Sequence, residues 1–204
     1  MDFTDISPCD LADALPRSQF LHHSIRPLWQ GIPRIAGPAF TARCAPGDHL
    51  MLHAAIYAAA PGDIIVVEAD DEYALAGGNV CAIAQQRGIA GFVVDGCIRD
   101  IAEVRDMQFP VFGRGVIPKP GAKKAFDPLN QPVVCGGVHV HPGDIIVADE
   151  EGIAVVPKEQ ASQAHNIAQQ RAQKDASLTL AQWQAQHRQT VNEKLKAIGQ
   201  VPLE

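Results

Sequence analysis

The sequence predicts one mixed α/β domain that is followed by a helical C-terminal extension. Between residues 62 and 114, short apolar runs of strand length alternate with segments of helical length. One pattern of a turn and a strand occurs twice, as PGDIIVV at residues 61–67 and as PGDIIVA at residues 142–148. Because these strands are apolar on both faces, they indicate a sheet that is covered on both sides.

The chain changes character near residue 158. From there to residue 198 it is rich in Gln, Ala and Lys, and its apolar residues recur at helical spacing. We therefore place the α/β domain at residues 1–157 and the helical tail at residues 158–204. This tail either packs at a subunit interface or lies as a solvated helix on its own domain.

Local signals predict the elements within the domain. Ser7-Pro8 predicts the start of a short helix, because serine caps a helix and proline suits its first turn. Proline and glycine at residues 46–47, 61–62 and 142–143 predict tight turns. Residues 18–36 are expected to be irregular. Helices are expected at 50–59, 79–87 and 99–107, and strands at 39–44, 64–67, 91–94 and 111–114. Residues 133–140 and 145–156 are expected to form an antiparallel sheet that glycines interrupt.

Composition narrows the class of protein. A chain of 204 residues is long enough to bury one core, and its formal net charge of -6 argues against nucleic acid or a membrane surface as a partner. The apolar runs are far shorter than the roughly 20 residues that cross a bilayer. The acidic and polar first residues do not resemble a signal peptide, so we expect a soluble, cytoplasmic protein. The five cysteines lack a CxxC pair and are expected to be free thiols.

A double glycine precedes the second expected helix. Gly77 and Gly78 let backbone N–H groups approach a ligand, and the start of a helix attracts an anion. Asn79, Val80 and Cys81 form the first turn of that helix. The segment is therefore a candidate substrate-binding element, although two glycines before a helix also occur in ordinary turns.

An arginine–aspartate pair follows the strand expected at residues 91–94. Loops at the carboxyl ends of such strands are where α/β folds bind their ligands. Arg99 offers a planar fork that suits a carboxylate, and Asp100 offers an oxygen ligand for a hard cation. The structural alternative is a helix start with an internal salt bridge.

Two weaker patterns remain open. Residues 148–152 form an acidic turn between two strands, for which a solvated hairpin tip is the simpler interpretation. His139 and His141 share one face of a strand at a spacing suited to zinc, but the sequence offers no evident third ligand.

Several motifs occur in an order that resembles one known family. They are PGDIIVV at residues 61–67, the Gly77-Gly78 turn, GxxGxxxDGxxRD at residues 88–100 and GDxxxxDxxG at residues 143–152. From about residue 10 to residue 157, the chain resembles the family of regulator of ribonuclease E activity A (RraA) and the 4-hydroxy-4-methyl-2-oxoglutarate aldolases. The resemblance implies a swivelling α/β/β/α sandwich and a homotrimer or homohexamer with sites between subunits.

The resemblance also implies roles for the candidate residues. In catalytic members, the arginine of the pair binds the carboxylate and carbonyl of an oxo-acid, and the aspartate holds Mg²⁺ or Mn²⁺ largely through waters. The amides of the Gly-rich loop bind the substrate carboxylate. Carried over, these roles fall on Arg99, Asp100 and residues 77–81. The family's tail can supply a glutamate to the neighbouring subunit, for which Glu193 is our candidate and His187 a second.

One departure from the family pattern bears on proton transfer. Catalytic members often carry Gly-Asp-x-Leu in the loop, where this chain has Gly78-Asn79-Val80-Cys81. Because the amide of Asn79 is not a base, the proton would pass to a metal-bound water or to another acid.

These observations favour a divalent-metal-dependent lyase that releases pyruvate from small oxo-acids. It would act as a 4-hydroxy-4-methyl-2-oxoglutarate-type aldolase, an oxaloacetate decarboxylase, or both. Splitting a C–C bond beside a carbonyl leaves an enolate, whose charge a cation and an arginine stabilise. Arg114, Lys119 and the His22-His23 pair are candidates for contacting the far end of the substrate. The alternative is a regulator that binds ribonuclease E without chemistry of its own.

Overall fold

The computed structural model describes residues 2–203. Contacts divide the chain into two compact units, of which the first ends at Ala168 and the second begins at Gln169. The expected boundary after residue 157 stays a prediction, and the first turns of the helix that follows it pack within the first unit.

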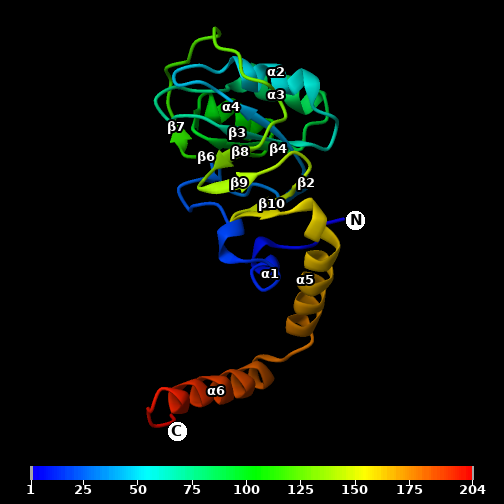
Figure 1. The fold of residues 1–204 in the computed structure, drawn as a ribbon, viewed down its shortest axis with the longest axis vertical. Helices are drawn as coiled ribbons and strands as arrows, with labels where there is room; N and C mark the ends of the chain where they lie inside the picture. The colour runs from blue at the N-terminus through cyan, green and yellow to red at the C-terminus, as the bar shows by residue number, and fades with distance from the viewer. Residues whose placement is uncertain (1, 204) are drawn as a thin grey trace. The chain divides into compact units, whose positions relative to one another are not determined.

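A curled seven-stranded sheet forms the centre of the first unit (Figure 1). Its strands in spatial order are β1 (Arg26–Pro27), β6 (Val111–Gly113), β4 (Gly91–Asp95), β3 (Ile64–Glu68), β2 (Ile35–Arg43), β10 (Ile145–Asp149) and β11 (Gly152–Val156). The four strands β2, β3, β4 and β6 run parallel, whereas β1, β10 and β11 pair antiparallel to their neighbours. Parallel strands end at one edge of a sheet, which brings the loops after β3 and β4 together.

Helices and two small sheets complete the first unit. The helices are α1 (Pro8–Leu11), α2 (Leu50–Ala58), α3 (Gly78–Gln86), α4 (Ile101–Asp106) and the first turns of α5 (Ala161–Ala176). Strand β5 (Cys97–Ile98) pairs with β7 (Gly115–Val116), and β8 (Val133–Cys135) pairs with β9 (Val138–Val140). The expected mixed α/β class with C-terminal helices is confirmed.

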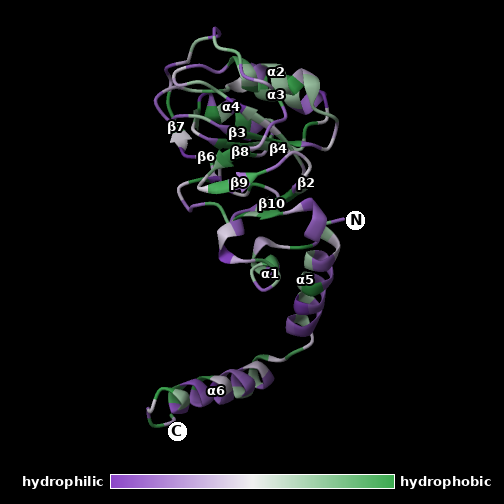
Figure 2. Ribbon diagram, viewed as in Figure 1, coloured by the Kyte–Doolittle hydropathy of each residue, from purple (hydrophilic) through white to green (hydrophobic). Residues whose placement is uncertain are grey.

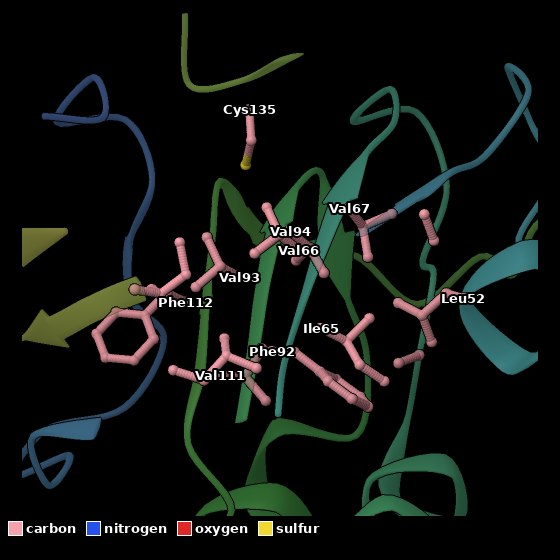
Figure 3. Close-up of a cluster of buried hydrophobic side chains, with 14 of the residues drawn as sticks. Leu52, Ile65, Val66, Val67, Phe92, Val93, Val94, Val111, Phe112 and Cys135 are labelled. Carbon is pink, nitrogen blue, oxygen red and sulfur yellow. The ribbon is translucent and has the colours of Figure 1, made fainter. Parts of the chain in front are cut away.

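The central strands are buried on both faces. All four apolar residues of β3, Ile64–Val67 in sequence, have no exposed surface. Helix α2 packs against this strand, and so does β8 of the small hairpin. Figure 3 shows the apolar side chains of β3, β4 and β6 gathered with Leu52 of α2 and Cys135 of β8. This two-sided burial explains why the strands read as unbroken apolar runs.

A second apolar cluster covers the opposite face of β10 and β11. Because strand side chains alternate, Ile146 belongs to the main core while its neighbour Val147 belongs to this second cluster. The second cluster also includes Leu11 of α1 and Ala164 and Ala168 of α5. Ser7 caps α1 as expected, because its hydroxyl accepts the backbone N–H of Asp10 at 3.1 Å.

One expected boundary differs from the structure for a local reason. The helix expected from Arg99 begins at Ile101, because Asp100 adopts a left-handed conformation with φ of 57°. The antiparallel pairing expected over residues 133–140 and 145–156 is present as two hairpins, β8–β9 and β10–β11, and Gly136 and Gly137 turn the first hairpin with positive φ. In addition, residues 18–36 contain β1 and the first residues of β2.

The second unit contains the end of α5 and helix α6 (Leu180–Ala197). Thr179 and Gln182 form a capping box at the start of α6. These helices carry mostly hydrophilic residues (Figure 2), yet Leu180 and Trp183 are exposed. No helix among residues 2–203 is long and apolar enough to span a membrane.

Candidate functional site

Four segments meet around a cavity of about 310 Å³ at the carboxyl ends of the parallel strands. The loop after β3 supplies residues 74–77, and the turn after β5 supplies Arg99. The start of α2 supplies His49 and His53, and the loop after β7 supplies Lys123. Two cationic side chains and two histidines therefore line one cavity. A larger cavity of about 480 Å³ lies beside Trp29 and Val116, away from the glycine loop and the Arg-Asp pair.

The Arg-Asp pair is fixed against the double glycine. The backbone N–H of Gly78 donates to Oδ2 of Asp100 at 3.1 Å, and Nε of Arg99 lies 3.4 Å from the same oxygen. The backbone N–H of Arg99 donates to the carbonyl of Ala76 at 2.9 Å. The left-handed conformation of Asp100, which aspartate tolerates better than most residues, turns its carboxylate back onto the loop. The structure thus brings together two motifs that the sequence analysis treated separately.

Both glycines lie directly against acidic side chains. A Cβ atom at Gly77 would overlap Oδ2 of Asp100, and a Cβ atom at Gly78 would overlap Oε2 of Glu103. Two carboxylates therefore lie directly beside this glycine pair. Neither glycine takes a positive φ, so their contribution is the room that they leave for these carboxylates.

Asp100 and Glu103 place carboxylate oxygens beside the glycine loop. Oxygen donors suit a hard cation, and Mg²⁺ characteristically keeps several waters while one or two carboxylates hold it. The carboxylates of Asp100 and Glu103 fit this mode of Mg²⁺ binding. A cage made entirely by protein does not fit, because residues 2–203 contain no group of three His, Cys, Asp or Glu side chains arranged to hold a metal ion.

The two histidines of the cavity form a stacked pair. The ring centroids of His49 and His53 lie 4.5 Å apart at an interplanar angle of 11°. Nδ1 of His49 lies 3.3 Å from the carbonyl oxygen of Ala74, and Nε2 of His53 lies 3.2 Å from that of Leu75. Burial lowers the pKa of His49, and burial together with the adjacent His49 lowers the pKa of His53 to about 4. Both rings are therefore neutral near pH 7.

Acidification is expected to destabilise the protein as the pH falls from about 6.5 toward 4. The pKa of His53 is about 4 in the folded chain, whereas an unfolded histidine titrates near 6.5. The unfolded chain binds the proton first, so stability is full above that range and is lost on acidification. Urea denaturation across this range should show a loss of about 1–3 kcal/mol in the free energy of unfolding. The loss should shrink in His53→Gln, and an unchanged slope in that variant would contradict this account.

A buried aspartate holds the loop that carries Lys123. Asp48, which is 5% exposed, accepts backbone N–H groups from Leu50 at 2.7 Å, Lys124 at 2.6 Å and Ala125 at 3.1 Å. Burial alone would raise the pKa of Asp48, but these three donors outweigh burial, so the pKa is lowered. The carboxylate is thus a structural anion that joins the start of α2 to the lysine loop.

Sequence reasoning missed three ionisable residues of this cavity, which are His49, His53 and Lys123. It recognised the turn at residues 46–48 but treated it as structural. An available signal was the His-x-x-x-His spacing just after that turn, because residues four apart share one face of a helix. Lys123 carries no comparable local signal.

The remaining loop candidates differ in position. Val80 lines the cavity, Asn79 is exposed, and Cys81 is fully buried. Burial, helped by the charge of Asp100, raises the pKa of the Cys81 thiol to about 12, which leaves the thiol protonated.

The candidates for contacting the far end of the substrate have other partners. Arg114 donates to Asp95, and Lys119 pairs with Glu72 at 3.3 Å. Neither basic side chain lines the cavity of about 310 Å³. His22 is exposed, and its Nδ1 lies 3.0 Å from Oγ of Ser24.

The structure also shows the contacts of the acidic turn at residues 148–152 and of the two candidates in the tail. Asp149 is buried and accepts from Arg34 at 2.9 Å, so the acidic turn is anchored rather than wholly solvated. In the second unit, Glu193 accepts from Gln189 at 2.9 Å, and His187 stacks on Trp183 with centroids 4.7 Å apart.

The two histidines proposed as a weak zinc pattern do not share a third ligand among the described residues. His139 is exposed on β9, and Nδ1 of His141 lies 3.7 Å from Oδ2 of Asp144.

The fold and the cavity define a mixed α/β protein with a cationic site at the carboxyl ends of parallel strands. A family model described as "RraA-like: Aldolase/RraA" matches residues 8–155, and the chain belongs to this family. A relative from Halalkalibacterium halodurans, provisionally named a 4-hydroxy-4-methyl-2-oxoglutarate aldolase, is 41% identical over 176 residues, which are 85% of this chain and 82% of the relative.

A second relative and a solved structure extend the comparison. The 4-hydroxy-4-methyl-2-oxoglutarate aldolase of Thermus thermophilus is 30% identical over 151 residues, which are 73% of this chain and 91% of that protein. The structure of Streptomyces coelicolor RraAS2, described as an unusual member of the RNase ES inhibitor RraA family, superimposes with a TM-score of 0.71 at 28% identity. That match covers 92% of this chain and 95% of the other.

Proposed function

We propose that this protein is a divalent-metal-dependent lyase that releases pyruvate from small oxo-acids. Its substrates would be 4-hydroxy-2-oxo acids of the 4-hydroxy-4-methyl-2-oxoglutarate type, oxaloacetate, or both. The observation that carries the proposal is the Arg99-Asp100 turn, which is fixed against Gly77-Gly78 at the edge of a cationic cavity. The aldolase names of the relatives support the same class of reaction.

The charges of the cavity suit a substrate with two carboxylates. Arg99 offers a planar fork for the carboxylate and carbonyl oxygens of the oxo-acid, and Lys123 offers a point charge for a second anionic group. The first amides of α3 add partial positive charge, because an α-helix begins at Gly78. As the C–C bond breaks, negative charge grows on the carbonyl oxygen, and a fixed guanidinium stabilises it more than it stabilises the substrate.

Asp100 and Glu103 are the residues that would hold the cation, Mg²⁺ or Mn²⁺. A bound cation would supply positive charge beside the developing enolate oxygen. The protein contributes the placement of Asp100, whose Oδ2 is held by the N–H of Gly78.

We extend the proposal to the assembly. A homotrimer or homohexamer would let the tail of one copy reach the cavity of another, where Glu193 or His187 would serve as an additional acid or base. The exposed Leu180 and Trp183 of α6 support a tail that contacts a second copy.

Loss of the proposed metal ligand is expected to stop pyruvate release. A coupled lactate dehydrogenase assay with oxaloacetate and Mg²⁺ or Mn²⁺ should show metal-dependent turnover in the wild type. Asp100→Asn should lower that turnover by about 100-fold at limiting metal, because it removes the charge that holds the cation. Binding of Mn²⁺, followed by its paramagnetic resonance signal, should weaken in parallel.

Asp106→Asn is the matched control. Arg105 and Asp106 form a second Arg-Asp pair, with Nε and Oδ1 3.8 Å apart and both side chains exposed. This variant should retain wild-type turnover and Mn²⁺ binding. Equal turnover in Asp100→Asn and Asp106→Asn would overturn the proposed role of Asp100.

The likeness to Streptomyces RraAS2 favours one alternative, a non-catalytic regulator that binds ribonuclease E. Purified ribonuclease E and this protein can be tested for direct binding and for slowed RNA cleavage. Inhibition of the nuclease without any affinity for Mn²⁺ would favour the regulator over the lyase.

A further inference from the structure

We propose that His49 is the general base and acid of aldol cleavage in this cavity. It would take the proton from the 4-hydroxyl of the bound hydroxy-oxo-acid and return that proton to the pyruvate enolate. This inference rests on the lyase function proposed above. The glycine loop of this chain carries Asn79, whose amide cannot accept the proton, and His49 would take that role.

The hydrogen bonds of His49 determine which ring nitrogen is basic. A carbonyl oxygen only accepts, so the contact of 3.3 Å to Ala74 places the proton on Nδ1. Nε2 then carries a lone pair. This atom is buried and has no hydrogen-bond partner among the described residues. A buried acceptor without a donor is uncommon in proteins, and a substrate hydroxyl would satisfy this one.

The ring is held in place from several sides. His49 is 7% exposed and stacks on His53. Its backbone N–H donates to the carbonyl of Ala122 at 2.9 Å, and its carbonyl accepts from the N–H of His53 at 3.3 Å. These contacts fix the orientation of the ring, which is the preorganisation that favours a general base.

The charges around the ring keep it in the basic form. Burial lowers the pKa of His49, and the positive charges of Lys123 and Arg99 act in the same direction. The hydrogen bond to Ala74 and the charge of Asp48 act in the opposite direction and are outweighed. The imidazole is therefore neutral near pH 7, which is the form that a general base requires.

Other groups of the cavity are poorer proton carriers. Nε2 of His53 lies 3.2 Å from the carbonyl of Leu75 and so carries the proton, and its pKa of about 4 makes the ring a weak base. The thiol of Cys81 is buried and stays protonated. Asn79 is exposed and its amide is not basic. His49 combines a free lone pair, burial and a place in the cavity.

The proposed step is balanced. The hydroxyl proton moves to Nε2 of His49, the C4–O bond becomes a carbonyl, and the C3–C4 bond breaks. Its electron pair forms the enolate of pyruvate, whose oxygen lies with Arg99. The proton on Nε2 then moves to C3, which becomes the methyl group of pyruvate. One hydroxy-oxo-acid gives pyruvate and a second carbonyl compound, with no net change in protons or electrons.

Oxaloacetate provides an internal comparison, because its decarboxylation begins without removal of a hydroxyl proton. His49→Asn keeps a donor for the carbonyl of Ala74 but removes Nε2. We expect the ratio of kcat/KM for 4-hydroxy-4-methyl-2-oxoglutarate cleavage to that for oxaloacetate decarboxylation to fall by about 100-fold. His53→Gln, which keeps a donor for Leu75, should change both rates by the same factor.

A second variant tests whether a loss of activity reflects the missing base or a general disturbance of the cavity. In His49→Ala, added imidazole should restore part of the aldol cleavage and none of any lost decarboxylation. A proportional fall of both activities in His49→Asn, without rescue in His49→Ala, would overturn the role of His49.

The controls separate this inference from the function on which it rests. Wild-type protein without metal-dependent pyruvate release from either substrate would overturn both. Metal-dependent release that Asp100→Asn removes, together with wild-type aldol cleavage in His49→Asn, would overturn only the assignment of the base.

Discussion

Replacing Arg99 by methionine is expected to lower kcat/KM for pyruvate release from either substrate by about 1,000-fold, which corresponds to about 4 kcal/mol of transition-state stabilisation. The guanidinium lines the cavity and is oriented by the Ala76 carbonyl through its backbone and by Asp100 through its side chain. Methionine retains most of the apolar stem but removes the positive charge and all five donors. The coupled pyruvate assay measures the loss, and the melting temperature checks that folding is retained.

Arg105→Met is the matched control for this prediction. Arg105 belongs to the neighbouring Arg-Asp pair on α4, it is more exposed, and its Nε contact to Asp106 is longer, at 3.8 Å. This variant should keep kcat/KM within about twofold of the wild type, because exposed ion pairs contribute little. Activity that survives in Arg99→Met, or that falls equally in both variants, would contradict a specific role for Arg99.

The Arg-Asp pair could be predicted because its signals are local. A buried strand, a short polar loop and a helix lie next to one another in the sequence, so the position of Arg99 at a strand end follows from periodicity alone. The same reasoning located Gly77 and Gly78 before a helix. That the two motifs touch follows from the parallel pairing of β3 with β4, which the alternation of strands and helices favours.

The remainder of the site depends on contacts that no local pattern encodes. Asp48 forms an isolated parallel bridge with Ala122, and this pairing brings Lys123 to the cavity that His49 lines. The two segments lie far apart in the chain, and neither is apolar or periodic enough to predict its partner. Arg114 illustrates the converse, because a basic residue after a strand looked available for a substrate, whereas the fold places Asp95 against it.

The Pro-Gly-Asp pattern occurs three times, and its aspartates make different contacts in the structure. In each copy the glycine takes a positive φ, of 73° at Gly47, 91° at Gly62 and 84° at Gly143, as the turn requires. The aspartates then diverge. Asp63 accepts one backbone N–H, from Ala60 three residues earlier, whereas Asp48 accepts three, two of them from the distant lysine loop. The repeat predicted the turn, and only tertiary structure distinguishes the three aspartates.

Because Asp48 accepts more hydrogen bonds than Asp63, replacing each by asparagine should lower the free energy of unfolding by different amounts. Asp48→Asn should lower the free energy of unfolding by about 2–4 kcal/mol, because an amide has one acceptor oxygen and its NH₂ group would face backbone donors. Asp63→Asn disturbs a single, more exposed bond and should cost about 1 kcal/mol or less. Urea denaturation at pH 7 measures both. Because folding lowers the pKa of Asp48, its contribution is present above about pH 4 and is lost as the pH falls through its lower folded value.

Enzyme kinetics test the role of Asp48 independently of its effect on stability. If Asp48 positions Lys123, then Asp48→Asn should raise KM for oxaloacetate at temperatures where the variant is still folded, whereas Asp63→Asn should not. Lys123 lines the cavity, and the carboxylate of Asp48 holds the backbone N–H of the next residue, Lys124. A small displacement of that loop would move the ammonium group relative to Arg99 and weaken binding of a substrate with two carboxylates. Equal losses of stability in the two variants, or an unchanged KM in Asp48→Asn, would show that the lysine loop is held by its other contacts, such as the 2.7 Å hydrogen bond from Ala122 to Gly47.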